Sequence, residues 1–192
     1  MRPADRAEPE DQLADPPADP ESVARTICLR LLTSRPRSRS ELAHALRRRN
    51  VPGEVAETIL DRLTAVKLID DEAFAADWVS ARHSGKGLAG RALAAELRSR
   101  GIAAETATEA VAGLDSDTER ATARRLVDRR LSNQPAGGGA GQVRRLVAML
   151  GRKGYPPGLA STVVREAIAE SAMESELTDG EVAGDEACCV DS

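Results

Sequence analysis

The sequence predicts an all-α protein, built from three tandem three-helix repeats that form an elongated, curved array. Ala and Leu, with many Arg and Glu, dominate it, and these are strong helix formers. Only one Phe, one Trp and one Tyr are present among 192 residues, whereas large cores usually draw on many aromatic side chains. Apolar residues also recur at helical spacing. Small local helical cores therefore fit this composition better than a β-sandwich or a doubly wound sheet.

The first repeat opens with three amphipathic helices. Ser38 and Glu41 have the spacing of a capping box before the second helix, and Pro52 suits the first turn of the third. The apolar positions follow a spacing of three to four residues, which places them on one face of each helix. They are Val23, Ile27 and Leu31, then Leu42 and Leu46, then Val55, Ile59, Leu63 and Val66.

The second and third repeats begin at strong helix-start signals. Asp70 and Asp115 are good N-cap residues, and Phe74 and Trp78 lie one turn apart on the helix that follows the first of them. A Gly-rich insert interrupts the third repeat. Contacts between neighbouring repeats, rather than one central core, would hold such an array together.

One helix and its C-terminal cap recur in all three repeats, at offsets of 51 and 53 residues. In each copy Asn or Gly supplies a left-handed C-cap, and the hydrophobe after it can fold back on the helix. The aligned sets are Leu42, Leu46, Arg49, Asn50 and Val51; Leu93, Leu97, Arg100, Gly101 and Ile102; and Leu146, Leu150, Lys153, Gly154 and Tyr155.

These patterns predict the domain organisation. Acidic, Pro-rich or apolar-poor ends have little to bury and are expected to be disordered. The predicted segments are a disordered tail over 1–21, repeats over 22–69, 70–114 and 115–170, an insert over 133–142 in the last repeat, and a disordered acidic tail over 171–192.

The net charge of −4 conceals a division along the chain. Each end is acidic, whereas the central part, 22–170, carries 25 basic and 17 acidic residues, a net charge of +8. A basic body between acidic tails indicates an anionic partner, either nucleic acid or an acidic protein surface. A well-solvated arginine-rich surface is the alternative.

Other features predict a cytoplasmic protein without a catalytic, cofactor or metal site. No apolar run approaches the ~18 residues of a membrane span, and the N-terminus lacks the apolar core of a signal peptide. Cys28 reads as a core residue, and Cys188 and Cys189 form no disulfide framework. The run Gly85-Lys86-Gly87-Leu88-Ala89-Gly90 matches a dinucleotide-binding pattern, but a helix precedes it where that pattern needs a strand. It is expected to be a flexible connector with His83 and Lys86 at a cationic tip.

Basic clusters end the equivalent helices of the first two repeats and mark that of the third, and they are the candidate partner-binding residues. Cations there also complement the helix dipole, so part of the pattern is ordinary helix design. Their recurrence nevertheless suits a periodic acidic partner, whether a phosphate backbone or a protein filament. The candidates are Arg47, Arg48, Arg49, Arg98, Arg100, Arg144, Arg145, Arg152 and Lys153.

Several phrases resemble the RecX family of bacterial recombination regulators. The most specific part of the match lies between Leu68 and Ile102. It consists of Leu68-Ile69-Asp70-Asp71-Glu72, Phe74-Ala75, Arg82, Gly85-Lys86-Gly87 and Gly101-Ile102. Ala24-Arg25 through Leu32, Arg37, Glu41-Leu42, and Leu146 through Tyr155 extend the match over 22–170. The long acidic tails and the Gly-rich insert depart from the family pattern.

The resemblance implies a regulator that binds RecA protein and the RecA–DNA filament, lodging in its groove. It implies that the regulator mostly restrains filament growth, ATP turnover, strand exchange and repressor cleavage, and so takes part in the control of DNA repair, recombination and the SOS response. Weak direct contact with DNA stays open. Two other functions also stay open at this point: a DNA-binding regulator with helix-turn-helix-like units, and a non-enzymatic helical-repeat adaptor.

Overall fold

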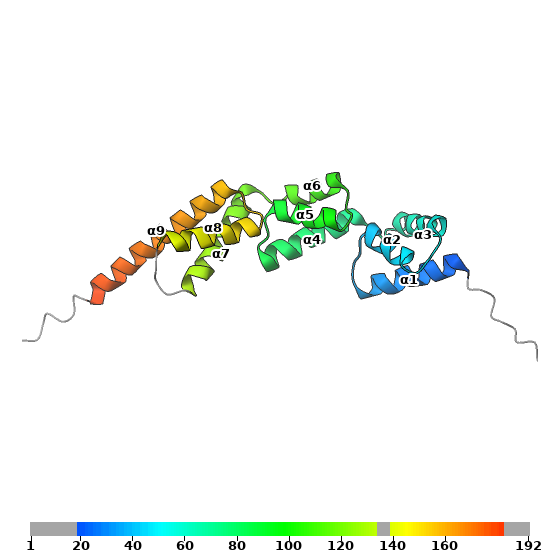
Figure 1. The fold of residues 1–192 in the computed structure, drawn as a ribbon, viewed down its shortest axis with the longest axis horizontal. Helices are drawn as coiled ribbons and strands as arrows, with labels where there is room; N and C mark the ends of the chain where they lie inside the picture. The colour runs from blue at the N-terminus through cyan, green and yellow to red at the C-terminus, as the bar shows by residue number, and fades with distance from the viewer. Residues whose placement is uncertain (1–18, 134–138, 183–192) are drawn as a thin grey trace, which may run out of the picture. The chain divides into compact units, whose positions relative to one another are not determined.

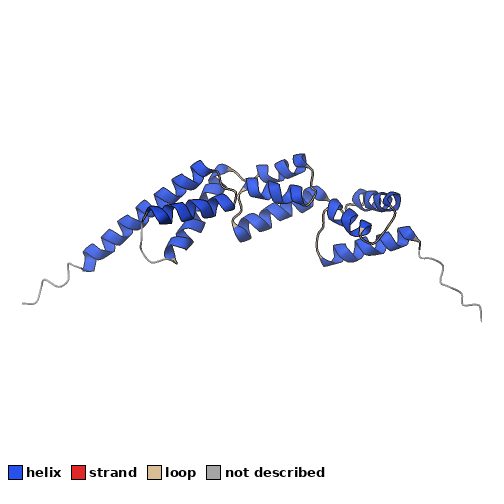
Figure 2. Cartoon of the chain, viewed as in Figure 1, coloured by secondary structure: helices blue, strands red, loops and turns tan. Residues whose placement is uncertain are grey.

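The structure is a computed structural model that describes residues 19–133 and 139–182 (Figures 1 and 2). This described part contains nine helices and no strand, which confirms the all-α prediction. The helices are α1 Pro20–Ser34, α2 Arg39–Arg47, α3 Gly53–Ala65, α4 Asp71–Lys86, α5 Gly90–Ser99, α6 Ala104–Ala112, α7 Ser116–Ser132, α8 Ala140–Arg152 and α9 Pro157–Val182.

The chain divides into two compact units. The first ends at Ile69 and comprises α1, α3 and most of α2, whereas Ser38–Ser40 group with the second unit. That second unit contains α4 to α9. Each unit is described by itself, so the elongated and curved arrangement of the repeats stays a prediction.

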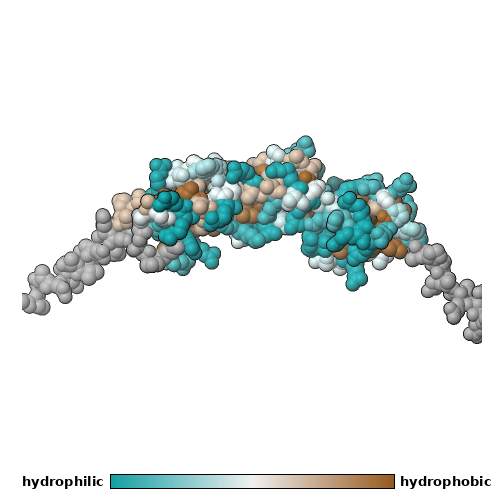
Figure 3. Space-filling model, in the orientation of Figure 1, coloured by the Kyte–Doolittle hydropathy of each residue, from teal (hydrophilic) through white to brown (hydrophobic). Residues whose placement is uncertain are grey.

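Each successive group of three helices has its own hydrophobic cluster. In the first unit Cys28, Leu46 and Ile59 lie fully within such a cluster, as the sequence predicts for Cys28. The second unit has two, one around Leu93 and Leu97 and one formed largely by α7, α8 and α9. Hydrophilic residues cover much of the visible surface between smaller hydrophobic areas (Figure 3). This arrangement is consistent with three small local cores.

The three predicted left-handed C-caps are confirmed. Asn50, Gly101 and Gly154 have φ values of 56°, 77° and 94°. In each copy the N–H of the next residue donates to a leucine carbonyl five residues earlier, at 3.2 Å. This is the six-to-one bond of a Schellman motif, which satisfies a helix carbonyl and folds the following hydrophobe back onto the helix. Those hydrophobes, Val51, Ile102 and Tyr155, are all buried.

The predicted N-caps of the leading helices are confirmed as well. The Asp70 carboxylate accepts a hydrogen bond from the Ala73 N–H at 3.0 Å, and Asp115 accepts one from the Thr118 N–H at 2.6 Å. The latter bond holds the pKa of Asp115 below its ordinary value. Helices α4 and α7 therefore begin where their sequences provide a carboxylate for free backbone N–H groups.

Three boundaries differ from the prediction. Helix α1 begins at Pro20 behind the Asp19 cap, inside the predicted tail, and α8 begins at Ala140, inside the predicted insert. Helix α9 continues to Val182, so residues 171–182 are helical where disorder was expected. Ala, Met, Glu and Leu in that stretch favour a helix even without an apolar face. The remaining parts of the predicted tails and insert, including Cys188 and Cys189, lie outside the described residues.

Backbone and side-chain hydrogen bonds join the second helix trio to the third. The Tyr155 hydroxyl donates to the Gly87 carbonyl at 3.1 Å, and the Ala89 N–H donates to the Lys153 carbonyl at 2.9 Å. The Gly90 N–H donates to the Glu119 carboxylate at 2.6 Å. These bonds fix the start of α5 against the end of α8 and the first turn of α7.

The expected flexible connector around Gly85–Gly90 is wrong, because the segment belongs to this junction. Helix α4 extends to Lys86, and His83 is buried rather than exposed at a cationic tip. Its Nδ1 bonds the Leu88 carbonyl at 2.8 Å, so Nδ1 carries the proton. Its Nε2 lies 3.0 Å from the Thr122 hydroxyl on α7.

Candidate functional site

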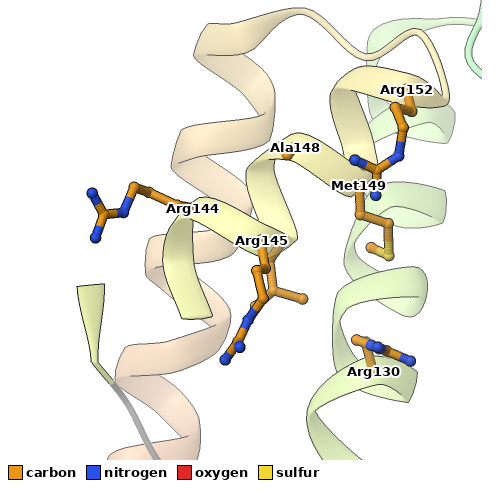
Figure 4. Close-up of a pocket in the computed structure, with 7 residues that line it drawn as sticks. Arg130, Arg144, Arg145, Ala148, Met149 and Arg152 are labelled. Atoms are coloured by element: carbon orange, nitrogen blue, oxygen red, sulfur yellow. The ribbon is translucent and has the colours of Figure 1, made fainter. Parts of the chain in front are cut away.

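Helices α7 and α8 border a pocket of about 520 Å³ whose lining is rich in arginine (Figure 4). Arg130 comes from the last turn of α7, and the other lining residues come from α8. No carboxylate is among them. The lining residues are Arg130, Arg144, Arg145, Leu146, Ala148, Met149 and Arg152.

The pocket has an apolar part between cationic groups. In Figure 4 the Met149 side chain extends toward α7, between Arg152 and Arg130 in this view, whereas Arg144 points away from the other arginines. Arg145, Met149 and Arg152 are spaced by four and three residues, which places them on one helix face. Leu146 is buried beneath this face. The helical period thus places the core leucines on one face of α8 and the arginines on another.

Arginines on the other side of α7 are paired within the fold. Arg120 donates to both carboxylate oxygens of Glu166 on α9, at 2.7 and 2.8 Å. Arg124 bonds Asp128 at 2.7 Å and Glu170 at 2.5 Å, and this pairing holds the pKa of Glu170 below its ordinary value. These ion pairs link α7 to α9, so Arg120 and Arg124 are already bound to carboxylates within the fold.

The pocket arginines have no such partners among the residues whose side chains the structure describes. Within residues 19–133 and 139–173, none of the four pocket arginines makes a hydrogen bond or ion pair through its guanidinium group. Several like charges around one concavity raise the local concentration of anions. A guanidinium presents a planar fork of donors that matches carboxylate and phosphate. The pocket is therefore suited to bind an anionic group from outside the chain.

The candidates of the first repeat lie at the end of α2. Arg47, Arg48 and Arg49 are all exposed and precede the left-handed Asn50. They belong to the first unit, whereas the pocket belongs to the second, so they form a basic cluster distinct from the pocket. In the second repeat Arg98, in the last turn of α5, is exposed as well.

Arg100 and Lys153 differ from the other candidates because their side chains are half-buried. Arg100 is half-buried, and its guanidinium carbon lies 3.7 Å from the centre of the Trp78 ring. Lys153 is half-buried, and its Nζ donates to the carbonyl of Lys86. Both side chains thus have contacts within the fold, a stacking contact for Arg100 and a hydrogen bond for Lys153. In this they differ from Arg98 and Arg152, whose side chains are exposed.

Among the pocket residues that sequence reasoning did not identify as site residues are Arg130 and Met149. Arg129-Arg130 stands out as a basic pair, but nothing local to α7 indicates which of the two meets α8. The spacing Arg145-Met149-Arg152 was the available signal for Met149, because it places a thioether between two cations on one face.

In the parts of the chain that are placed, no group of three or more His, Cys, Asp or Glu side chains could hold a metal ion. Among the same residues, no helix has the length and apolar content needed to cross a membrane.

Comparison with known proteins identifies the family. Models of the first and second three-helix domains of RecX match residues 24–63 and 70–111. Regulatory protein RecX of Thermobifida fusca is 50% identical over 165 residues, covering 86% of this chain and 89% of that protein. RecX of Streptomyces coelicolor is 50% identical over 162 residues, covering 84% and 86%. RecX of Mycobacterium marinum is 48% identical over 155 residues, covering 80% and 88%.

Solved structures agree on the fold. The crystal structure of RecX from Lactobacillus salivarius has a TM-score of 0.69 at 19% identity, covering 79% of this chain and 98% of that one. A second crystal structure, of a regulatory protein RecX, has a TM-score of 0.65 at 25% identity, covering 76% and 72%. The sequence identity to the curated relatives, extending over most of both chains, shows that this chain belongs to the RecX family of regulatory proteins.

Proposed function

We propose that this protein binds the RecA recombinase filament and restrains its growth, ATP hydrolysis, strand exchange and coprotease activity. Membership of a family of regulatory proteins supports this proposal. The observation that carries it is the set of pocket arginines that lack a partner within the described chain. A filament of repeating protomers offers acidic groups at regular intervals, which such a surface can meet.

In this proposal the protein acts by binding, in the bacterial cytoplasm, and catalyses no reaction. Its basic surfaces lie on separate helix trios: Arg47, Arg48 and Arg49 on the first, and the pocket arginines on the third. Individually weak contacts that are linked in one chain add through effective concentration. One molecule would thus engage more than one site of the filament and impede its turnover.

The test measures RecA's DNA-dependent ATP hydrolysis with increasing amounts of this protein. The parent protein is expected to suppress hydrolysis. Arg144→Glu combined with Arg145→Glu should raise the concentration needed for half-inhibition by at least about tenfold, because lost and reversed charge contacts cost more than 1.4 kcal/mol together.

A matched control changes the net charge equally elsewhere. Arg25→Glu with Arg30→Glu alters two exposed arginines of α1 that lie outside the basic helix ends, and it should leave inhibition near the parent level. Thermal melts verify that both variants fold. If the Arg144 and Arg145 variant is folded and inhibits as well as the parent, these arginines do not bind the filament.

Two alternatives predict different results in the same experiments. A DNA-binding regulator predicts tight duplex binding without RecA that weakens steeply as salt rises. A helical-repeat adaptor predicts no effect on RecA hydrolysis at any concentration. Inhibition of RecA together with weak, sequence-independent DNA binding would favour the proposed function over both.

A further inference from the structure

The pocket between α7 and α8 combines chemistry that a purely phosphate-binding surface does not need. Met149 extends between Arg130 and Arg152 in Figure 4, and the exposed Ala148 adds apolar surface. Methionine is flexible and polarizable, which suits it to surfaces that accept apolar side chains of a partner protein. The surrounding guanidinium groups are suited to carboxylates, which they can bind through two hydrogen bonds each.

Single-stranded nucleic acid is the less favourable occupant. Proteins that bind single strands combine a basic groove with aromatic side chains on which bases stack. No aromatic residue lines this pocket. Of the three aromatic residues in the chain, Phe74 and Tyr155 are buried, and Trp78 carries the Arg100 guanidinium on its ring. The pocket therefore offers cations and an apolar centre without a stacking platform.

We propose that this pocket binds an acidic segment of a partner protein, in which carboxylates flank an apolar side chain. The apolar side chain packs on Met149, and the carboxylates pair with Arg130, Arg145 and Arg152. The inference rests on the proposed function for the identity of the partner as a filament protein. The chemistry of recognition itself follows from the pocket and can be measured without RecA.

The experiment compares three fluorescent probes on the full-length protein by fluorescence anisotropy. One is a peptide of repeated Glu-Asp-Leu triplets, the second has Ser in place of each Leu, and the third is an oligothymidylate of comparable length. The first peptide is expected to bind most tightly. Replacing Leu should weaken binding by about tenfold, because burial of a leucine side chain is lost at unchanged charge.

Variants assign these differences to the pocket. Met149→Ser should reduce the difference between the two peptides to less than about twofold, because it removes the apolar centre and keeps every charge. Arg130→Gln with Arg152→Gln should weaken both peptides by at least about tenfold, since each lost charge-assisted contact is strong. Arg129→Gln with Arg165→Gln removes two exposed arginines that do not line the pocket, and it serves as the matched control.

Three outcomes would overturn the inference: equal binding of both peptides, no detectable peptide binding, or tighter binding of the oligothymidylate that the pocket variants abolish. The peptide comparison uses the parent protein, so it decides the question even if a variant fails to fold. Normal RecA inhibition with equal binding of the peptides would refute only the pocket assignment. Selective peptide binding without any effect on RecA would instead refute the proposed function.

Discussion

Gly154 provides a sharp test of how the second and third helix trios pack. It follows the end of α8 with φ of +94°, a conformation that L residues rarely adopt. A Cβ atom added there would lie 2.6 Å from the Cβ atom and 2.8 Å from the backbone nitrogen of Ala92 on α5. Gly154→Ala therefore introduces an unfavourable backbone conformation and a steric clash with α5 at the same time.

The expected cost follows from these two effects. A left-handed conformation costs an L residue roughly 1–2 kcal/mol. Overpacking a tight contact adds typically ~1–3 kcal/mol, and Ala92 cannot rotate away because the contact includes its backbone. Gly154→Ala should thus lower the free energy of unfolding by about 2–5 kcal/mol, a large part of the ~5–15 kcal/mol of a typical domain.

The assay is urea denaturation followed by circular dichroism, with Gly151→Ala as the control. Gly151 lies three residues earlier in α8, and no atom lies within 4 Å of its added Cβ. That substitution should stabilise the protein by roughly 0.5–1 kcal/mol, because alanine favours a helix interior. If the two variants shift the denaturation midpoint alike, the close approach of α8 to α5 is wrong.

Three further predictions concern buried side chains. Leu97 is fully buried, so Leu97→Ala should lower the free energy of unfolding by ~2–5 kcal/mol in the same urea assay. Burial raises the pKa of the Cys28 thiol. In a variant whose other two cysteines are Ser, Cys28 should therefore react with a thiol reagent at least about tenfold faster in the unfolded protein than in the folded one. Equal rates would show that Cys28 is accessible in the folded protein. Burial also raises the pKa of Tyr155 to about 12. Since unfolded tyrosine ionises near 10, stability is fully present below about pH 10 and is lost as pH rises toward 12. Absorbance of this single tyrosine should report the raised pKa, and titration near 10 in the folded protein would contradict its burial.

Local chemistry explains which features were predictable. Asn50, Gly101 and Gly154 could be assigned as left-handed caps because the residue type and the following hydrophobe both specify that turn. Asp70 and Asp115 could be assigned as N-caps for a similar reason. In contrast, the burial of His83 depends on Thr122, which lies 39 residues further along the chain. No pattern near His83 indicates that partner.

The glycines of the run Gly85–Gly90 show that the same glycine spacing can occur in a junction between helices as well as in a dinucleotide-binding turn. Gly87 ends α4 with φ of +61°, and an added Cβ would lie 2.8 Å from Leu126. Gly90 begins α5 and donates its N–H to Glu119. Without a strand before them, these glycines permit the close approach of helices. Helix α4 precedes the run, as the sequence predicts, where a dinucleotide-binding site needs a strand.

The division of arginines into paired and unpaired sets could not be obtained from charge counts. The acidic partners of Arg120 and Arg124 on α9 lie 46 residues away, so only the packing of α7 against α9 brings them together. That packing places carboxylates on one side of α7, whereas Arg130, on the side facing α8, has none as a partner among the residues whose side chains the structure describes. Replacing a paired arginine should mainly loosen α9, whereas replacing a pocket arginine should mainly weaken partner binding, because no contact within the described fold is lost. Stability and binding measured on both sets of variants would therefore separate the arginines that maintain the third helix trio from those available to a partner.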